Sequence, residues 1–533
     1  MRLLILAIVL NISLTGLQLH SQPLKLNWQH CYGGSNYENG YNIIKGTGGF
    51  ILFCGTDSHD GDVTGFHGGY GDYWLIKTDT AGNLVWNKTY GGIDQDDASY
   101  MKQTSDGGFI LFGDAFSNSG EVVGNHGGSD FWLVKVDSLG NIEWTKCLGG
   151  SCNDAGYKID LTQDGGFVCI GSSCSHDGDV TTNYGNYDVW VVRLSQTGDI
   201  IWQKSFGGTF TDWGISIKST SDKGAIIGGL IGSSDGNIQC NYRNFDDCWV
   251  SKLDSSGNIE WQNCYGGTGN ESVVDIIPTD DGGYIFNSGT NSTDGDISGN
   301  HGDYDFWVVK LDHMGNLEWQ KCFGGSSTDR SYVIKKSSDG NYLVGGYTLS
   351  NDGDVHGNHS LPPNYSDMWL IKISPLGDLL WQQCFGGDDS EGINDILELN
   401  GGTIMLLGGA QTSDNSGDVQ CNHHGPGTND VWLLSVTDTT YVGINDKKGR
   451  LYNIWTSPNP ADENVSFNIT GPDFSTDTKI MVFNNCGQKI QILSLKKGEK
   501  STLFDCHSVV SGLYYYTYIN NLFSGAGKII ISH

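Results

Sequence analysis

Pairs of aspartates that flank a glycine recur along the chain, and they are the residues best suited to chemistry. The first pair lies in SHDGDVTGFHGGYGDYW, residues 58–74, where Asp60 and Asp62 precede a histidine and a third aspartate. Carboxylate oxygens are the ligands that Ca²⁺ prefers, so the pairs are candidate calcium ligands. The candidates are Asp60, Asp62, Asp177, Asp179, Asp294, Asp296, Asp352 and Asp354.

The spacing of these carboxylates differs from that of an EF-hand, which places oxygen ligands at positions 1, 3 and 5 before a glycine. Other repeats change one partner, as at Glu121, Asn237 and Asp418. Asp and Asn side chains also hydrogen-bond to the backbone in turns. We therefore favour a turn role, with Ca²⁺ as the alternative, and the sequence indicates no other cofactor.

A histidine recurs in the long loop of five repeats, and these histidines mark loops of a candidate binding face. They are His67, His126, His301, His359 and His423. Tyr184 and Tyr242 take this position in two other repeats. Because tyrosine is a poor zinc ligand, a packing or turn role is favoured over a zinc site.

One further aspartate recurs in every repeat, two residues before a tryptophan. The series is Asp72, Asp130, Asp188, Asp247, Asp305, Asp367 and Asp430. A role that is repeated so regularly is a structural one. We expect these carboxylates to accept hydrogen bonds from backbone N–H groups of the loops.

A catalytic site normally breaks the symmetry of its repeat. The strongest departures from the repeat are Trp213, Arg243 and Arg330, which are scattered and form no recognisable nucleophile or acid–base set. The sequence therefore predicts no catalytic residue and favours a protein that is not an enzyme.

Two series of tryptophans give the chain a period of about 58 residues, which is typical of a repeat architecture. Together they contain 14 of the 16 Trp. The series that precedes a Gly pair is Trp28, Trp86, Trp144, Trp202, Trp261, Trp319 and Trp381; the other is Trp74, Trp132, Trp190, Trp249, Trp307, Trp369 and Trp432.

Each repeat contains four strand-like segments separated by turn signals. In residues 96–144 they are SYMKQT, the apolar FILFG, FWLVKV and a fourth that begins at IEW. Four antiparallel strands in a repeat of this length predict one blade of a β-propeller. Burying one tryptophan between blades contributes roughly 4–6 kcal/mol before entropy, so the two series are expected to hold the blades together.

The order of the segments predicts how the ring closes. The chain starts with a fourth strand, at 26–34, and the last repeat ends with a third strand, at 431–436. Pairing the two would close an all-β, seven-bladed propeller over residues 25–438 and leave no exposed sheet edge. The structural alternative is a parallel β-helix or a linear array. The long loops between second and third strands all lie on one face, which is the predicted binding face.

Five of the 14 cysteines share one register, three residues after a tryptophan. They are Cys31, Cys147, Cys264, Cys322 and Cys384, and we interpret them as small buried hydrophobic residues. Cys240–Cys248 and Cys486–Cys506 are the candidate disulfides, which an exported protein can form.

The N-terminus indicates where the protein is located, and the net charge indicates which partners are disfavoured. Residues 1–21 have an Arg, an apolar core of eight residues and a small residue at Ser21, as in a secretory signal peptide. That core is too short for a membrane anchor, and no later segment could span a membrane. The formal net charge of −31 opposes nucleic acid and anionic lipid as partners.

The last eighty residues break the period. A linker at 439–455 precedes a predicted small β-sandwich at 456–533. Pro458, Asn459 and Pro460 open a strand, Gly487 follows another, and Gly512, Leu513 and Lys528 mark the end. This segment resembles the C-terminal sorting domain of type IX secretion in Bacteroidetes. The resemblance implies export by the type IX secretion machinery, and release or attachment at the outer-membrane surface.

Three functions are compatible with these observations. The first is a secreted or surface-attached binding scaffold for a glycan or a protein. The second is a hydrolase or lyase that acts on polysaccharide at the same long-loop face. The third is a structural component of a surface layer. The sequence favours the first.

Overall fold

The computed structural model describes residues 23–239, 246–359, 365–411, 416–421, 428–440, 453–457, 461–470, 477–484, 489–519 and 524–533. Every regular element in these ranges is a strand, and they include no helix long and apolar enough to cross a membrane. The chain divides into two compact units after Thr439, apart from residues 400–402, which group with the second unit. The predicted signal peptide lies outside the described residues.

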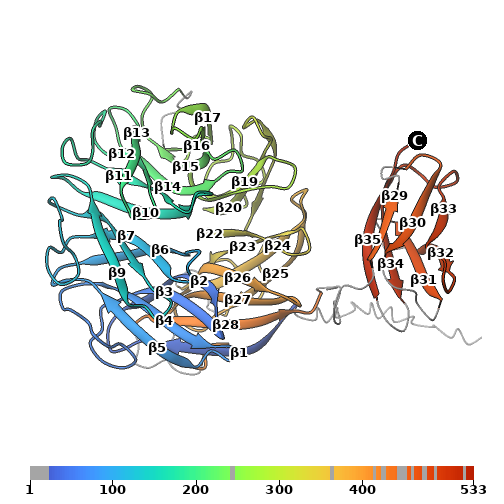
Figure 1. Cartoon of the computed structure of the whole chain (residues 1–533), viewed down its shortest axis with the longest axis horizontal. Helices are drawn as coiled ribbons and strands as arrows, with labels where there is room; N and C mark the ends of the chain where they lie inside the picture. Colours follow the sequence, from blue (N-terminus) through green and yellow to red (C-terminus); the bar gives the residue numbers. More distant parts are fainter. Residues whose placement is uncertain are drawn as a thin grey trace, which may run out of the picture. The chain divides into compact units, whose positions relative to one another are not determined.

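Seven four-stranded antiparallel sheets, the blades, make up the first unit (Figure 1). Blade 1 contains β2 (Glu38–Gly46), β3 (Gly49–Thr56), β4 (Asp72–Asp79) and β5 (Leu84–Tyr90). Blade 2 contains β6 (Asp96–Gln103), β7 (Phe109–Ala115), β8 (Asp130–Val136) and β9 (Ile142–Leu148). Blade 3 contains β10 (Asp154–Leu161), β11 (Phe167–Ser173), β12 (Asp188–Leu194) and β13 (Ile200–Phe206).

The other blades repeat this order. Blade 4 contains β14 (Asp212–Ser219), β15 (Ala225–Ile231), β16 (Asp247–Leu253) and β17 (Ile259–Tyr265). Blade 5 contains β18 (Ser272–Pro278), β19 (Tyr284–Thr290), β20 (Asp305–Leu311) and β21 (Leu317–Phe323). Blade 6 contains β22 (Asp329–Lys336), β23 (Tyr342–Thr348), β24 (Asp367–Ile373) and β25 (Leu379–Phe385). Blade 7 contains β26 (Glu391–Leu399), β27 (Thr403–Ala410), β28 (Asp430–Asp438) and β1 (Leu24–Tyr32).

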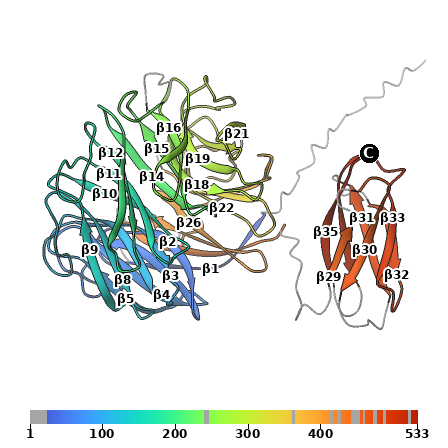
Figure 2. The ribbon, with the colours of Figure 1, turned by 45° about the horizontal axis from the view of Figure 1, so that its top comes forward.

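The ring closes as the sequence predicted. β1 pairs antiparallel with β28, with Leu24 opposite Asp438 and Tyr32 opposite Val431. The first strands of the blades contact one another in turn, from β2 through β6, β10, β14, β18 and β22 to β26, and β26 contacts β2. Figures 1 and 2 show these strands toward the centre of the ring, around its axis, which we call the channel. The first unit is therefore a closed β-propeller.

The connections differ between the two sides of the ring. β2 ends at Gly46 and β3 begins at Gly49, whereas β3 ends at Thr56 and β4 begins at Asp72. We call the side with the short connections the turn side and the side with the long connections the loop side. Each first strand starts on the loop side and ends on the turn side.

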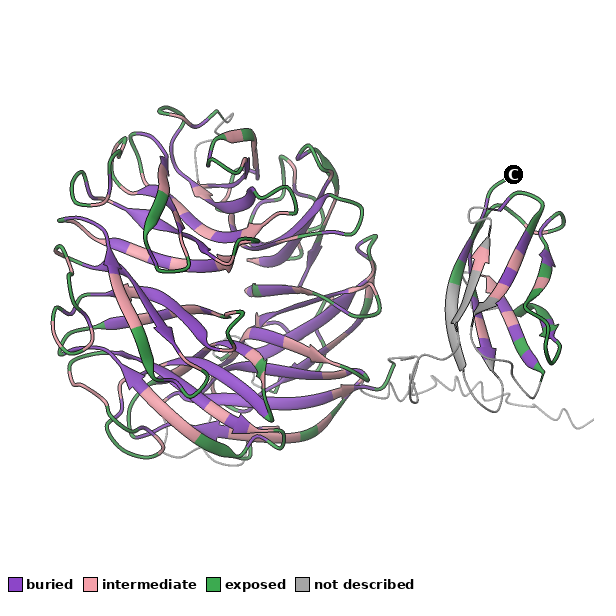
Figure 3. Cartoon of the chain, viewed as in Figure 1, coloured by how far each residue is buried: buried purple, intermediate pink, exposed green. Residues whose placement is uncertain are grey.

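The core lies between the blades, where buried residues form continuous bands along the second and third strands (Figure 3). Trp74, Trp132 and the five other third-strand tryptophans are fully buried. Some of these rings pack on aromatic rings of the preceding blade: Tyr73 lies 4.5 Å from Trp132 and Phe131 lies 4.7 Å from Trp190, between ring centroids. These contacts place the third-strand rings between neighbouring sheets.

The fourth-strand tryptophans behave differently. Trp381 is buried, but the other six, from Trp28 to Trp319, are only half-buried. Their rings cover the hairpin glycine of the next blade, as Trp144 covers Gly198. Since the fourth strand is the outermost of its blade, one side of each ring faces solvent. The expectation that all fourteen rings are enclosed between sheets therefore holds fully only for the third-strand series.

The cysteine interpretation needs correction. Cys31 forms a disulfide with Cys421, and Cys152 forms one with Cys174. Cys264 is also disulfide-bonded, so two of the five in-register cysteines are not simply buried hydrophobic residues. Cys147, Cys322 and Cys384 are free and buried, as predicted.

Both predicted disulfides are wrong, because Cys248 and Cys506 are free thiols in buried positions. Cys248 is on the third strand of blade 4, where its Sγ contacts Ser288 Oγ of blade 5. Its side chain is therefore packed between two blades.

The second unit is a two-sheet β-sandwich. One sheet has the order β29 (Asn453–Ser457), β30 (Asn464–Thr470), β33 (Ser501–Asp505). The other has the order β32 (Lys489–Leu495), β31 (Thr478–Asn484), β34 (Gly512–Ile519), β35 (Ser524–Ile531). Phe467 of the first sheet meets Tyr516 of the second edge to face, with centroids 4.8 Å apart. Apolar side chains from both sheets thus form one core.

The sorting-motif residues are spread over this sandwich. Gly512 and Leu513 start β34, and Lys528 is an exposed residue of β35. Pro458, Asn459, Pro460 and Gly487 lie outside the described residues.

Candidate functional site

The Asp-Gly-Asp pairs bind backbone of their own chain. Ser35 N–H donates to Asp60 Oδ1 at 2.8 Å, and Gly33 N–H donates to Asp62 Oδ2 at 3.3 Å. Asp62 N–H in turn donates to Gly33 O at 2.8 Å. The long loop of blade 1 therefore holds the segment by which the chain enters that blade.

The same joint recurs at the other three pairs. Asp177, Asp294 and Asp352 accept from Ser151, Thr268 and Ser326, and Asp179, Asp296 and Asp354 accept from Gly149, Gly266 and Gly324. The intervening glycine has a positive φ, 66° at Gly61, and a Cβ there would overlap Gly33 O. Among the described residues, no group of three or more His, Cys, Asp or Glu side chains could hold a metal ion. A Ca²⁺ site at these pairs stays a prediction.

The loop histidines pair with the repeated aspartates. The Nδ1 atoms of His67, His126, His301 and His359 lie 2.6 to 2.7 Å from Oδ2 of Asp72, Asp130, Asp305 and Asp367. The backbone N–H of each histidine donates to the same oxygen, as the sequence predicted for these aspartates. His423 lies outside the described residues, and a ligand-binding role for the histidines stays a prediction.

Two of these histidines also reach the next blade. His67 Nε2 lies 3.2 Å from Glu121 Oε2, and His359 Nε2 lies 3.6 Å from Asp418 Oδ2. Burial lowers the pKa of His67, but its contacts with Asp72 and Glu121 outweigh burial and raise that pKa above its ordinary value. These contacts hold neighbouring loops together.

Buried carboxylates gather where each blade begins. Asp72 and Asp96 flank Gly91, and analogous pairs flank the other Gly–Gly segments. Burial raises the pKa of Asp72 and of Asp96 to about 6, and each Asp is affected further by a neighbouring negative charge. Oδ1 of Asp72 is buried and has no hydrogen-bond partner among the described residues. The repeated acids therefore have a structural role, and burying their carboxylates costs desolvation free energy.

Residues that differ between blades lie at the start of the first strands. On the loop side the variable position directly follows the first acidic residue of each blade. It is occupied by Asn39, Asp97, Ala155, Trp213, Ser272, Arg330 and Gly392. We call the group Tyr157, Tyr187, Trp213, Tyr304, Arg330, Tyr332 and Tyr347 the loop-side mouth.

Aromatic rings and one cation dominate the loop-side mouth. The half-buried ring of Trp213 lies between Tyr157 and Tyr187, at centroid distances of 5.8 and 5.9 Å. On blades 5 and 6 the Arg330 guanidinium carbon lies 3.8 Å from the centroid of Tyr304. Tyr332, which is 39% exposed, lines a pocket of 280 Å³ together with Arg330 and Tyr304. Such rings offer apolar faces with polar edges to a ligand.

Two acids face each other at the variable position of blade 2. Asp97 of β6 is directly opposite Asp114 of β7 in the strand pairing. Burial first, and then their mutual charge, raises the pKa of Asp114 well above its ordinary value, and burial also raises the pKa of Asp97. Like charges directly opposite each other destabilise a sheet, so the pair is not explained by strand stability.

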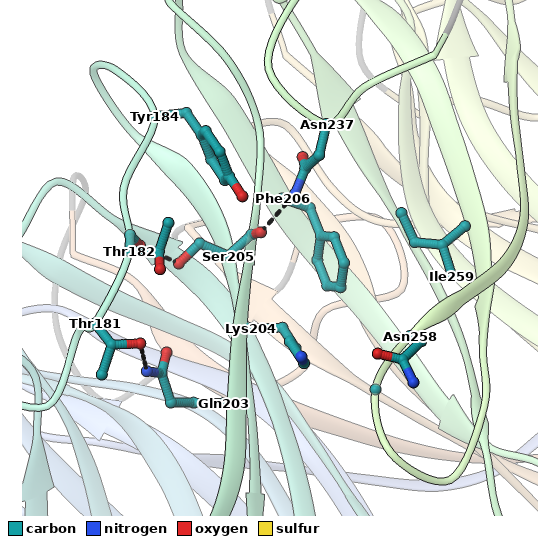
Figure 4. Close-up of a pocket in the computed structure, with 11 residues that line it drawn as sticks. Thr181, Thr182, Tyr184, Gln203, Lys204, Ser205, Phe206, Asn237, Asn258 and Ile259 are labelled. Carbon is teal, nitrogen blue, oxygen red and sulfur yellow. Dashed lines mark hydrogen bonds between the residues drawn. The ribbon is translucent and has the colours of Figure 1, made fainter.

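A polar rim pocket of 380 Å³ lies between blades 3 and 4 (Figure 4). It forms where two departures from the repeat coincide: Tyr184 replaces a histidine and Asn237 replaces an aspartate. Asn237 Nδ2 donates to Ser205 O at 2.9 Å, and Tyr184 binds Asp188 through its backbone N–H. Because Tyr184 has no ring nitrogen for Asp188, its hydroxyl is directed toward the pocket (Figure 4).

Sequence reasoning found Trp213 and Arg330 as exceptions but did not recognise that they occupy the same position of the first strand in their blades. The signal that would have shown this is the alignment of the first strands on their leading acidic residue. That alignment shows which first-strand positions differ from blade to blade. In a propeller, equivalent positions of the first strands lie on one ring around the axis, so such residues belong to one end of the molecule.

Comparison with known proteins identifies the second unit. The family model of the secretion system C-terminal sorting domain matches residues 456–532. The protein is thus a β-propeller that carries a sorting domain of type IX secretion, as the sequence predicted. This domain indicates export, handling by the type IX machinery, and a secreted or cell-surface location.

The likenesses over the propeller are distant. The regulatory protein FlaEY of Caulobacter vibrioides is 23% identical over 321 residues, which are 53% of this chain and 33% of that protein. The chain therefore spans about a third of the length of this curated relative.

Two solved structures are similar to this chain. The Pan2 WD40 domain of Neurospora crassa has 9% identity and a TM-score of 0.34, covering 65% of this chain and 90% of that one. A puromycin hydrolase has 11% identity and a TM-score of 0.37, covering 70% and 50%. At such scores the architecture rests on the strand pairings described above.

Proposed function

We propose that this protein is a secreted, surface-attached or released binding scaffold that holds a glycan at its loop-side mouth. The observation that carries the proposal is a pair of aromatic groups at the loop-side ends of first strands, one around Trp213 and one around Arg330 and Tyr332, at positions that vary between blades. The residues repeated in every blade are engaged in joints, so the variable residues are those left to select a ligand.

The chemistry of the mouth suits a sugar. The faces of aromatic rings stack on the C–H faces of sugar rings, while the edges of the mouth supply hydrogen bonds. Arg330 donates N–H groups, and Asn270 and Glu271 line the same pocket. A mostly apolar pocket with a few polar groups that fix orientation is typical of a ligand site.

A glycan array followed by calorimetric titration tests this function. We expect the exported chain to bind at least one glycan, and Trp213→Ala and Arg330→Ala to weaken binding by about tenfold or more. Tyr184→Ala, in the rim pocket, is the matched control and should leave the affinity unchanged.

Two results would overturn this assignment. One is the absence of any glycan ligand together with binding of a protein partner at the same residues. The other is loss of glycan binding only in Tyr184→Ala, which would move the site to the rim pocket.

One observation favours the second candidate, a hydrolase or lyase. A carboxyl group with a raised pKa, such as that of Asp114, can act as a general acid beside an ionised partner. In that case the bound glycan would be cleaved, and Asp97→Asn and Asp114→Asn would each abolish release of reducing ends. Binding without any turnover would leave the scaffold function alone.

A further inference from the structure

The turn side of the channel carries a cluster of lysines that the long loops do not reach. Six residues after the leading acid, the first strands place Ile44, Lys102, Asp160, Lys218, Ile277, Lys335 and Leu397. A cavity of 660 Å³ opens there, and Lys102, Lys218, Lys335 and Lys336 line it. Four lysines around one cavity are unusual in a chain with only 30 basic residues and a formal charge of −31.

Three of these lysines have carboxylate partners. Lys102 Nζ lies 2.9 Å from Asp160 Oδ1, and Lys335 Nζ lies 2.7 Å from Asp395 Oδ1. Lys336 pairs with the exposed Asp280. The ion pairs thus compensate three of the four charges.

The carboxylates that remain nearby are also engaged. Deeper in the channel, Lys158 Nζ lies 2.6 Å from Asp275 Oδ1, which also accepts from Ser216 Oγ at 3.2 Å. At the rim, Glu398 accepts hydrogen bonds from the backbone and hydroxyl of Ser338, at 2.7 and 2.8 Å.

Lys218 is the exception. Among the described residues, no carboxylate lies within ion-pair distance of its Nζ, whose neighbour is the ring of Tyr100 at 5.9 Å from the centroid. The same ring lies 5.3 Å from Lys102 Nζ and 5.1 Å from Lys158 Nζ. Three ammonium groups therefore converge on one phenol.

The titration of this cluster reflects an excess of positive charge. Burial lowers the pKa of Lys218 and, together with the charge of Lys102, outweighs Tyr100, Asp160 and Asp275, which raise that pKa. Burial would raise the pKa of Tyr100, but Lys335, Lys218, Lys102 and Lys158 outweigh it and lower that pKa to about 8. The lowered pKa of Tyr100 is the direction expected where positive charge is in excess.

We propose that the turn-side cavity binds an oxyanion, either a small ion or the carboxylate, sulfate or phosphate group of a larger ligand. Lys218 Nζ is its principal donor, Tyr100 lines the same cavity, and Lys335 and Lys336 add positive charge around it. Ammonium–oxyanion hydrogen bonds are among the stronger ones in proteins. This site is independent of the loop-side mouth, because it lies at the opposite end of the first strands.

Titration of the full chain with sodium sulfate, phosphate and acetate, at ionic strength held constant with chloride, tests the proposal. We expect saturable binding of at least one of them by calorimetry, and a rise in Tm with its concentration. The preferred ion identifies the oxyanion class. Lys218→Met should weaken binding by about tenfold or more. Lys204→Met, in the rim pocket, should have no effect.

A second measurement keeps the proposal testable if Lys218→Met does not fold. An anion beside Tyr100 neutralises the field of the lysines, so it should move the tyrosinate titration near pH 8 to higher pH. Tyr100→Phe should remove that titration step from the ultraviolet difference spectrum. The proposal is overturned if none of the three ions moves the titration, or if each binds Lys218→Met as tightly as the unaltered chain.

Discussion

At the scale of single residues, the third-strand tryptophans show which side chains the repeat depends on. Trp190 Nε1 donates to Gln203 Oε1 at 2.8 Å, and Trp307 Nε1 donates to Gln320 Oε1 at 2.9 Å. Blade 2 has Thr145 at this position, and Trp132 Nε1 is buried with no hydrogen-bond partner among the described residues. A buried donor without a partner costs stability.

Thr145→Gln should therefore stabilise the protein. The new amide oxygen can accept from Trp132 Nε1, and its nitrogen can donate to the loop in place of the Thr145 hydroxyl, which now donates to Glu121 O. We expect a gain of about 1 kcal/mol in the free energy of unfolding, measured by urea titration. Gln320→Thr, which removes the acceptor of Trp307 Nε1, is the converse control and should lower the free energy of unfolding by a similar amount. A Thr145→Gln variant less stable than the unaltered chain would contradict this explanation.

The buried acids predict how stability depends on pH. Burial raises the pKa of Asp72 and Asp329 to about 6, and raises that of Asp188 to about 7. These groups bind protons more tightly in the folded chain, so the stability they contribute is present at low pH and lost as the pH rises through about 6 to 7. The raised pKa of His67 acts in the same direction.

Calorimetry should therefore give a higher Tm at about pH 5 than at about pH 8. Below about pH 4 the trend should reverse, because lysine partners hold the pKa of Asp160 and Asp275 below the ordinary value and protonation would break those pairs. A Tm that falls steadily from pH 8 to pH 5 would contradict the assignment of the buried acids.

At the scale of elements, two disulfides link segments that are separated by very different lengths of chain. Cys31–Cys421 closes a loop of sequence separation 390, and Cys152–Cys174 one of 22. The first adds a covalent link where β1 completes blade 7, whereas the second only joins two loop segments of blade 3. In the chain-entropy description the longer loop gives about 2.5 kcal/mol more stabilisation.

Replacing both cysteines of each pair by serine measures this difference. We expect Cys31→Ser with Cys421→Ser to lower the midpoint of urea unfolding more than Cys152→Ser with Cys174→Ser. An equal or larger loss from the second double variant would mean that the closure of the ring does not depend on its covalent link.

The sequence predicted the strands and their pairing because each signal is local or periodic. A tryptophan every 58 residues and a leading fourth strand were enough to predict the pairing of β1 with β28. The disulfides were not predictable in this way, because Cys31 and Cys421 occupy different positions of the repeat and are brought together only by ring closure. The candidate mouths were missed because their residues come from several blades and each occurs once.

At the scale of the whole molecule, the residues that recur in every blade and the residues that vary have different roles. Residues that recur, such as Asp62 and His67, join blades to one another, and their carboxylates and imidazoles already have partners. Residues that vary occupy the loop-side and turn-side ends of the first strands, which contact one another around the ring. The sorting domain indicates that the propeller is exported.

The crystal structure of the complex with a glycan selected on the array would test this division most directly. The account predicts the sugar at the loop-side mouth, stacked on Trp213 or Tyr332 and within hydrogen-bond distance of Arg330. A sugar bound instead along the Asp-Gly-Asp loops, on residues that recur in every blade, would contradict it.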